Sequence, residues 1–164
     1  MSAAVPASDL KAYRRALGSF ATGVCVVTAH TSEGPLGITV NSFASVSLDP
    51  PLILWCLDES SDRWPAFAAA ERFAVHVLSA EGQADSERFA WGICRLEPGE
   101  FTVRGDGPPL MPHAIARFDC VTADRVQMGD HMVIFGRVEG YEATPGDALT
   151  FYKGLYGRAE GQGR

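Results

Sequence analysis

A run of hydrogen-bonding side chains lies inside a stretch that otherwise has the apolar content of β-strands. Residues 39–61 read TVNSFASVSLDPPLILWCLDESS, so hydroxyl and amide groups alternate with apolar ones. Asn41, Ser42, Ser45 and Ser47 provide polar side chains, and the backbone of residues 44–47 can offer N–H groups if the strand bends outward there. These groups suit a ligand that needs several donors. The alternative is an edge strand with a solvated face, because Ser, Thr and Asn are common in turns.

A second candidate group is His131, which follows Gly129 and Asp130. Gly-Asp favours a hairpin turn, so the simplest alternative is a turn followed by an exposed histidine. No second ligand lies at a spacing that would make His131 a metal ligand, and no metal is predicted. The chain has no Ser-His-Asp order, phosphate loop or zinc spacing that stands out.

Helices and strands must bring these groups together. The predicted helices are one capped by Ser8 or Asp9 and ended by Gly23, one from Ser61 or Asp62 to about residue 70, and one from Ser79 to about residue 91. The predicted strands cover residues 24–30, 36–41, 52–57, 73–78, 114–127, 131–143 and 149–153. Residues 92–112 are expected to be mostly loop, with a short strand near residues 101–103. Many short strands with hairpin turns and few helices indicate an antiparallel barrel with helices packed outside.

Length and charge limit the possible functions. The chain has 164 residues, 46% of them apolar, which suffices for one domain with a sizeable core. We expect a flexible tail at residues 1–8, one domain at residues 9–158 and a flexible tail at residues 159–164. The formal charge is −6 and no basic run exists, so nucleic acid is excluded as a partner, as is a membrane. An acidic protein must therefore bind a phosphate-bearing ligand with local donors.

The cysteine pattern and the N-terminus bear on the compartment. The four cysteines lie far apart with no CxxC pair, which favours reduced thiols. The first residues have neither the basic nor the apolar region of a secretory signal, and no apolar run is long enough to cross a bilayer. The sequence therefore predicts a cytoplasmic protein.

Four patterns together resemble the flavin reductase family, the FMN-binding split barrels. They are FATGV at residues 20–24, the block at residues 39–51 with its Asp-Pro-Pro, the Gly-Asp-His at residues 129–131, and a Tyr-x-Gly-x-Tyr-Gly pattern at residues 152–157. The resemblance spans roughly residues 10–158. It implies a mainly β fold with helices, an antiparallel split β-barrel of Greek-key type, and a homodimer in which each flavin lies near the subunit boundary.

The resemblance also implies an activity. The protein is expected to be an NAD(P)H:flavin oxidoreductase that transfers hydride from nicotinamide C4 to flavin N5. FMN is the expected flavin, with FAD possible, and either NADH or NADPH is the co-substrate. Reduced flavin would then pass to a partner flavin-dependent monooxygenase. Residues 92–112 match the family least and are expected to shape specificity.

Carried over by position, the family's contacts fall on three groups of residues. The expected cofactor-binding residues are Thr39, Asn41, Ser42, Ala44, Ser45, Val46 and Ser47; Cys56, Leu57, Asp58, Ser60 and Ser61, which receive the ribityl chain and phosphate; and Arg88, Phe89, Tyr152 and Tyr156. His131 is expected near the nicotinamide, where it would bind the carboxamide or cover the ring.

Several of these residues have a second interpretation. Ser60 and Ser61 fit as phosphate donors beside a helix N-terminus, although Ser61 equally fits a simple helix cap. Arg88 is either a phosphate partner or a solvated arginine, and Phe89 either contacts flavin or packs in the core. The two tyrosines, Tyr152 and Tyr156, line the ligand site or a dimer interface.

Two functions from other classes stay open. The same motif would serve a flavin-binding carrier or sensor without turnover. A relative of pyridoxamine phosphate oxidases, or a haem-binding protein on the same barrel, is the weaker alternative.

Overall fold

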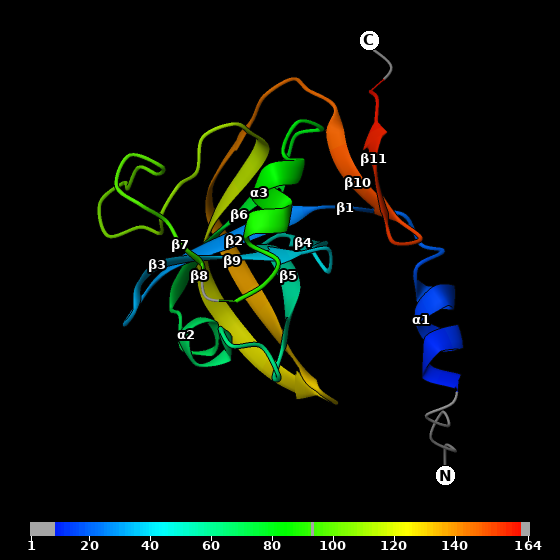
Figure 1. Ribbon diagram of the computed structural model, residues 1–164. Helices are drawn as coiled ribbons and strands as arrows, with labels where there is room; N and C mark the ends of the chain where they lie inside the picture. The colour runs from blue at the N-terminus through cyan, green and yellow to red at the C-terminus, as the bar shows by residue number, and fades with distance from the viewer. Residues whose placement is uncertain (1–8, 93, 162–164) are drawn as a thin grey trace.

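The structure is a computed structural model that describes residues 9–92 and 94–161, and it is mainly β and antiparallel, as predicted (Figure 1). Its elements, in chain order, are α1 (Leu10–Leu17), β1 (Thr22–Gly23), β2 (Cys25–Thr31), β3 (Gly34–Val40), β4 (Ala44–Leu48), β5 (Pro51–Asp58), α2 (Trp64–Ala68), β6 (Arg72–Leu78), α3 (Gln83–Arg88), β7 (Cys94–Arg95), β8 (Ala114–Met128), β9 (His131–Ala143), β10 (Ala148–Tyr152) and β11 (Leu155–Ala159).

Eight of the strands form one sheet, in the order β4-β5-β9-β8-β6-β2-β3-β7. The other three form a smaller sheet in the order β1-β10-β11, and a bridge between Ser79 and Ala148 joins the two. The pairings of β4 with β5, β6 with β8 and β8 with β9 each contain a register shift, which increases twist and bends the sheet. The longest hairpin, β8–β9, turns at Gly129, whose φ of +63° glycine adopts at little cost.

The main core lies under α2 and combines the apolar faces of β2, β3, β5 and β6. Trp55 meets Phe67 and Phe73 edge to face, with ring centroids 5.9 Å apart in both pairs. All three rings are buried, and burial of one such side chain contributes about 1.5–3 kcal/mol. Because β5 is fixed on its inner face by Trp55, the end of β5 has a defined position.

A buried histidine fastens the long loop before β8 onto the sheet. His76 on β6 is fully buried; its Nδ1 lies 3.1 Å from the Val26 carbonyl, and the Met111 N–H donates to its Nε2 over 2.9 Å. These bonds define a neutral ring with the proton on Nδ1. The pKa of His76 is lowered to about 4, mainly by burial. The bond to the Val26 carbonyl opposes this change, and the charge of Arg117 adds to it.

Gly37 on β3 has no side chain, and the space that this leaves is filled by the residue after α3. The ring of Phe89, just after α3, lies where a Cβ on Gly37 would be: such an atom would come within 2.5 Å of Phe89 Cδ1. Phe89 is fully buried, and its carbonyl accepts the Thr39 N–H at 2.9 Å. The segment that follows α3 is thereby held against the end of β3.

The three helices are shorter than predicted. The first ends at Leu17, because the chain turns at Gly18 and residues 22 and 23 pair with β10; Gly23 does not end the helix. The helix expected from residue 61 or 62 begins only at Trp64, after a turn. The helix expected from Ser79 begins at Gln83, because Ser79 is paired with Ala148 instead of capping.

Helix α1 lies to one side of the sheets in Figure 1 and buries none of its residues. Its apolar residues Leu10, Tyr13 and Leu17 are about half exposed, and Phe20 is 79% exposed. The helix therefore has an apolar face, and no element among residues 9–92 and 94–161 buries it. The chain holds α1 only near its end, where the Lys153 N–H donates to the Gly18 carbonyl at 2.9 Å.

The predicted strands are present within a few residues, and residues 92–112 are mostly loop. Near residues 101–103 the structure has a single bridge, between Thr102 and Leu110, instead of a strand. Strand β11 lies partly in the region expected to be a polar tail, since it continues to Ala159. Residues 1–8, predicted to be flexible, are outside the described part of the chain. No helix that the structure describes is long and apolar enough to cross a bilayer.

Candidate functional site

A cavity of about 440 Å³ opens where β3 and β5 end and β9 begins. It is bounded by the end of β3, the end of β5 with the loop behind it, the segment after α3, and the first residue of β9. Its lining residues are Ile38, Thr39, Val40, Asn41, Ser42, Cys56, Asp58, Ser60, Ser61, Asp62, Arg63, Ala90, Trp91, Gly92 and His131. The structure thus brings together eight of the residues singled out from the sequence: Thr39, Asn41, Ser42, Cys56, Asp58, Ser60, Ser61 and His131.

Strand register accounts for this convergence. Asp58, the last residue of β5, pairs with His131, the first residue of β9. Ser42, after β3, is tied to β5 through Cys56: the Cys56 N–H donates to Ser42 Oγ at 2.9 Å, and Ser42 Oγ donates to the Cys56 carbonyl at 3.4 Å. The polar residues after β3 are therefore fixed against the strand end that carries Asp58.

The carboxylate of Asp58, the last residue of β5, holds the loop that follows this strand. Asp58 Oδ1 accepts both the N–H and the hydroxyl of Ser60, each at 2.8 Å, and these bonds lower the pKa of Asp58. Ser61 Oγ accepts the Arg63 N–H at 3.2 Å, which makes a local turn and not a cap on α2. The expected contribution of a helix N-terminus at Ser60 and Ser61 is therefore not part of this geometry.

The imidazole of His131 stands at the rim of the cavity. Its Nδ1 lies 2.7 Å from Asp130 Oδ1, and the side chain is 42% exposed. A carboxylate at Nδ1 orients the ring and leaves Nε2 available to another group.

A second cavity, of about 300 Å³, adjoins the first. It shares Thr39, Val40, Asn41, Ala90 and Trp91 with the first cavity and adds Val24, Ser86, Phe151 and Tyr156. The hydroxyl of Tyr156 is 2.8 Å from Ser86 Oγ, and Thr39 Oγ1 donates to the Ser86 carbonyl at 2.7 Å. Aromatic rings dominate one side, which suits a flat ligand.

The indole of Trp91 belongs to both cavities and is 84% exposed. An exposed tryptophan between two cavities is a ready stacking surface. No periodicity or motif in the sequence indicated Trp91, because it lies in the irregular segment after α3.

Other predicted residues lie outside both cavities. Residues 44–47 are on the edge strand β4, where Ala44, Ser45 and Val46 are exposed and Ser47 is half-buried, and the pairing with β5 has a register shift between Ser45 and Ser47. The other edge of β4 pairs with no strand that the structure describes, so backbone N–H groups there are available.

Two predicted residues lie in the core and line neither cavity. Leu57 is fully buried in the main core. Phe89 is fully buried in the second core cluster, the position that its alternative interpretation describes. Tyr152 is 45% exposed, with the Lys153 ammonium 5.1 Å from its ring centroid.

Arg88 is bound elsewhere. Its two terminal nitrogens donate to the two carboxylate oxygens of Glu100 at 2.7 and 2.9 Å, and it also donates to the Arg95 carbonyl. This contact lowers the pKa of Glu100 to about 2. The structure therefore places Arg88 against the loop after β7 and away from the cavities.

A different arginine lines the first cavity. Arg63 is 6% exposed, and its terminal nitrogens donate to the Phe89 and Ala90 carbonyls, the second at 3.0 Å. Burial lowers the pKa of its guanidinium. Sequence reasoning missed Arg63, whose position between a turn and a short helix gave no motif to recognise.

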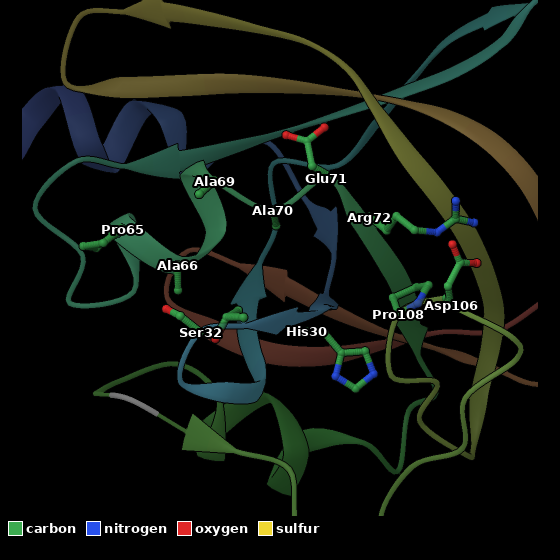
Figure 2. A pocket seen from close by; sticks show the side chains of 12 residues that line it. His30, Ser32, Pro65, Ala66, Ala69, Ala70, Glu71, Arg72, Asp106 and Pro108 are labelled. Carbon is green, nitrogen blue, oxygen red and sulfur yellow. The ribbon is translucent and has the colours of Figure 1, made fainter.

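A further cavity of about 410 Å³ lies at the other end of β2, beside α2 (Figure 2). His30, Arg72 and Asp106 reach it from three different segments. Its other charged residue, Glu71, pairs with Arg125 at 3.2 Å, and Arg72 pairs with Glu139 at 2.9 Å. Because these pairs neutralise most of its charge, this cavity offers less to an ionic ligand than the first. Residues 9–92 and 94–161 contain no group of three or more His, Cys, Asp or Glu side chains placed to hold a metal ion.

The comparisons with known proteins agree with this geometry. A family model described as "Flavin reductase like domain" matches residues 17–160. The FMN reductase (NADH) SmoA of Agrobacterium fabrum is 48% identical over 148 residues, which cover 90% of this chain and 85% of that protein. The flavin-dependent monooxygenase reductase subunit HsaB of Mycobacterium tuberculosis is 36% identical over 156 residues, covering 90% of this chain and 81% of that protein.

A solved structure is similar over the whole chain. The NADH:FAD oxidoreductase SgcE6 of Streptomyces globisporus, in complex with NAD and FAD fragments, superposes with a TM-score of 0.86 at 32% identity, covering 99% of this chain and 100% of that chain.

Proposed function

The chain belongs to the flavin reductase like family, and on that premise we propose that it is an NAD(P)H:flavin oxidoreductase. The observation that carries the proposal is the pair of adjoining cavities at one end of the sheet, one rich in hydrogen-bonding groups and one lined by aromatic rings. FMN is the proposed flavin, with FAD possible, and NADH the first co-substrate to test, with NADPH as the other.

A bound flavin would supply the redox chemistry, by accepting hydride from a reduced pyridine nucleotide. The part of the protein is to bind and orient the two ring systems. Thr39 and Asn41 belong to both cavities, and Ser42 and Cys56 line the first. The loop at residues 58–63 is proposed for the phosphate end, and the available N–H groups of residues 44–47 for the edge of the ring.

His131 is proposed to contact the nicotinamide. Asp130 orients its ring from the side of Nδ1, so Nε2 can accept a hydrogen bond from a carboxamide N–H. No general base is required, because hydride transfer moves no proton through the protein.

NADH oxidation followed by absorbance, crossed with FMN, FAD and riboflavin, tests the activity. We expect steady loss of NADH at catalytic protein concentration. Flavin binding without NADH loss would instead support the carrier or sensor alternative. The His131→Gln variant should raise the KM for NADH severalfold while it leaves the Kd for FMN within about twofold. An unchanged KM and kcat would remove His131 from this role.

The assembly is a further part of the proposal. We propose a homodimer, because α1 exposes Leu10, Tyr13 and Leu17 on a face that nothing among the described residues covers. The bends in the larger sheet support its description as a split barrel. We also propose a cytoplasmic location and a partner flavin-dependent monooxygenase, the latter by analogy with the HsaB relative. Sedimentation equilibrium tests the dimer, and a coupled assay with a candidate oxygenase tests the partner.

A further inference from the structure

The charge balance of the first cavity is unusual, because the one arginine among its described lining residues is buried and none of them is a lysine. Among its described lining residues, Arg63 is the only lysine or arginine, while Asp58 and Asp62 are acidic. The chain as a whole carries a net charge of −6, so no broad positive field helps an anion to enter. Among the described lining residues, Arg63 is therefore the fixed positive charge that an anionic group could meet.

The guanidinium of Arg63 makes no direct ion pair within the described chain, and the nearby Asp62 acts on its charge without contact. Three arginines have a buried Nε without a hydrogen-bond partner: Arg63, Arg72 and Arg125. Arg72 and Arg125 each pair with a carboxylate, of Glu139 and Glu71 respectively. Arg63 forms no ion pair with any carboxylate that the structure describes. A buried charge without a partner is costly, so this one indicates a missing anion.

Arg63 also has N–H groups that form no hydrogen bond within the described chain. A guanidinium carries five N–H bonds, and two of the nitrogens of Arg63 each donate to a backbone carbonyl, of Phe89 and Ala90. These two bonds hold the side chain in place without neutralising it. The remaining N–H groups, with Ser61 from the same loop, suit the several acceptor oxygens of a phosphate.

We propose that Arg63 provides the counter-charge for the phosphate of the bound flavin, and that it thereby makes the protein select FMN over riboflavin. This inference rests on the proposed function. It replaces Arg88, the arginine nominated from the sequence, which is bound to Glu100. A fixed guanidinium charge in the cavity wall also explains how an acidic protein binds a dianionic ligand.

Calorimetric titration of the oxidised protein with FMN and with riboflavin tests the inference. In the unmodified protein we expect FMN to bind at least tenfold more tightly than riboflavin, a difference that corresponds to about 1.4 kcal/mol. In Arg63→Met this preference should fall to within about twofold, and in Arg63→Lys, which keeps the charge, part of it should return. The read-out is the ratio of the two Kd values, so it does not depend on turnover.

The ratio of the Kd values for FMN and riboflavin distinguishes the loss of a charge contact from a structural change in the cavity. Loss of the bonds to the Phe89 and Ala90 carbonyls would disturb the cavity wall and weaken both flavins equally, and that result would overturn the inference. Arg88→Met is the matched comparison: it removes an arginine that is paired elsewhere and should leave the ratio unchanged. A collapse of the ratio in Arg88→Met, with none in Arg63→Met, would restore the arginine nominated from the sequence.

Two further measurements distinguish the sources of the anion. If Arg63→Met changed the ratio of the KM values for NADPH and NADH and left the FMN-to-riboflavin ratio intact, the anion would belong to the nucleotide and the inference would be wrong. Inorganic phosphate, at ionic strength matched with NaCl, should raise the Tm of the unmodified protein and not that of Arg63→Met. If neither flavin bound but phosphate still stabilised the protein through Arg63, the proposed function would fail while an anion site remained. If neither flavin nor phosphate bound, the proposed function and the inference about Arg63 would both fail.

Discussion

The buried histidine that fastens the loop before β8 gives a stability profile that can be measured. His76 is neutral in the folded protein, where burial lowers its pKa to about 4 from an ordinary value of 6.5. Between these two values the unfolded chain binds a proton that the folded chain does not. The free energy of unfolding must therefore fall as the pH is lowered through this range.

The expected size follows from the difference between the two pKa values. At about 1.4 kcal/mol for each pH unit, His76 contributes about 3 kcal/mol that is present above pH 6.5 and lost by about pH 4. Below pH 4 both states carry the proton, and the loss from this group stops. Protonation would also remove the acceptor for the Met111 N–H and bring a positive charge near Arg117.

Urea unfolding at a single protein concentration, from pH 4 to pH 7.5, provides the assay. His76→Gln should be less stable at pH 7 by about 1–3 kcal/mol, because the Val26 carbonyl and the Met111 N–H lose a fitted partner. Its profile should be flatter than that of the unmodified protein by about 3 kcal/mol over the range. His30→Gln, at an exposed position, is the control. Parallel profiles for the unmodified protein and His76→Gln would refute the reasoning.

Three other predictions concern the site and the assembly. Gly37→Ala places a Cβ 2.5 Å from the ring of Phe89 and should cost about 1–3 kcal/mol of unfolding free energy in urea, whereas Gly23→Ala, with open space around it, should cost less than about 1 kcal/mol; equal costs would contradict the packing. Trp91→Ala should leave stability within about 0.5 kcal/mol, since the indole is exposed, yet weaken flavin or NADH binding about twofold to tenfold by titration; unchanged affinity for both would remove it from the site. Leu17→Asp on α1 should shift sedimentation equilibrium toward monomer without loss of circular dichroism signal, and an unchanged mass would mean that this face is not the interface.

The sequence was a good guide to the strands and to the groups that they carry in register. Ser42, Asp58 and His131 meet at one cavity because pairing of β5 with β9 sets Asp58 opposite His131. Strand periodicity indicated the strands that carry these residues, and only the fold shows which strands pair. The edge strand β4 corresponds to the alternative interpretation of the polar run, an edge strand with a solvated face.

Helix ends and arginine partners were harder to predict. Ser79 is a good cap by residue type, but its backbone pairs with Ala148, nearly seventy positions away. Arg88 and Arg63 look equally basic in the sequence. Only the fold reveals that Glu100 reaches Arg88 and that no carboxylate of the described chain reaches Arg63. Such choices depend on contacts between distant segments, which local pattern does not encode.

The wall common to the two cavities has a kinetic consequence. Thr39, Val40, Asn41, Ala90 and Trp91 border both volumes, so two occupants would lie side by side against the same few residues. Electron donor and acceptor can then be bound to the protein at the same moment. Initial rates measured against both substrates should give intersecting double-reciprocal lines, the mark of a ternary complex, and not the parallel lines of a ping-pong cycle.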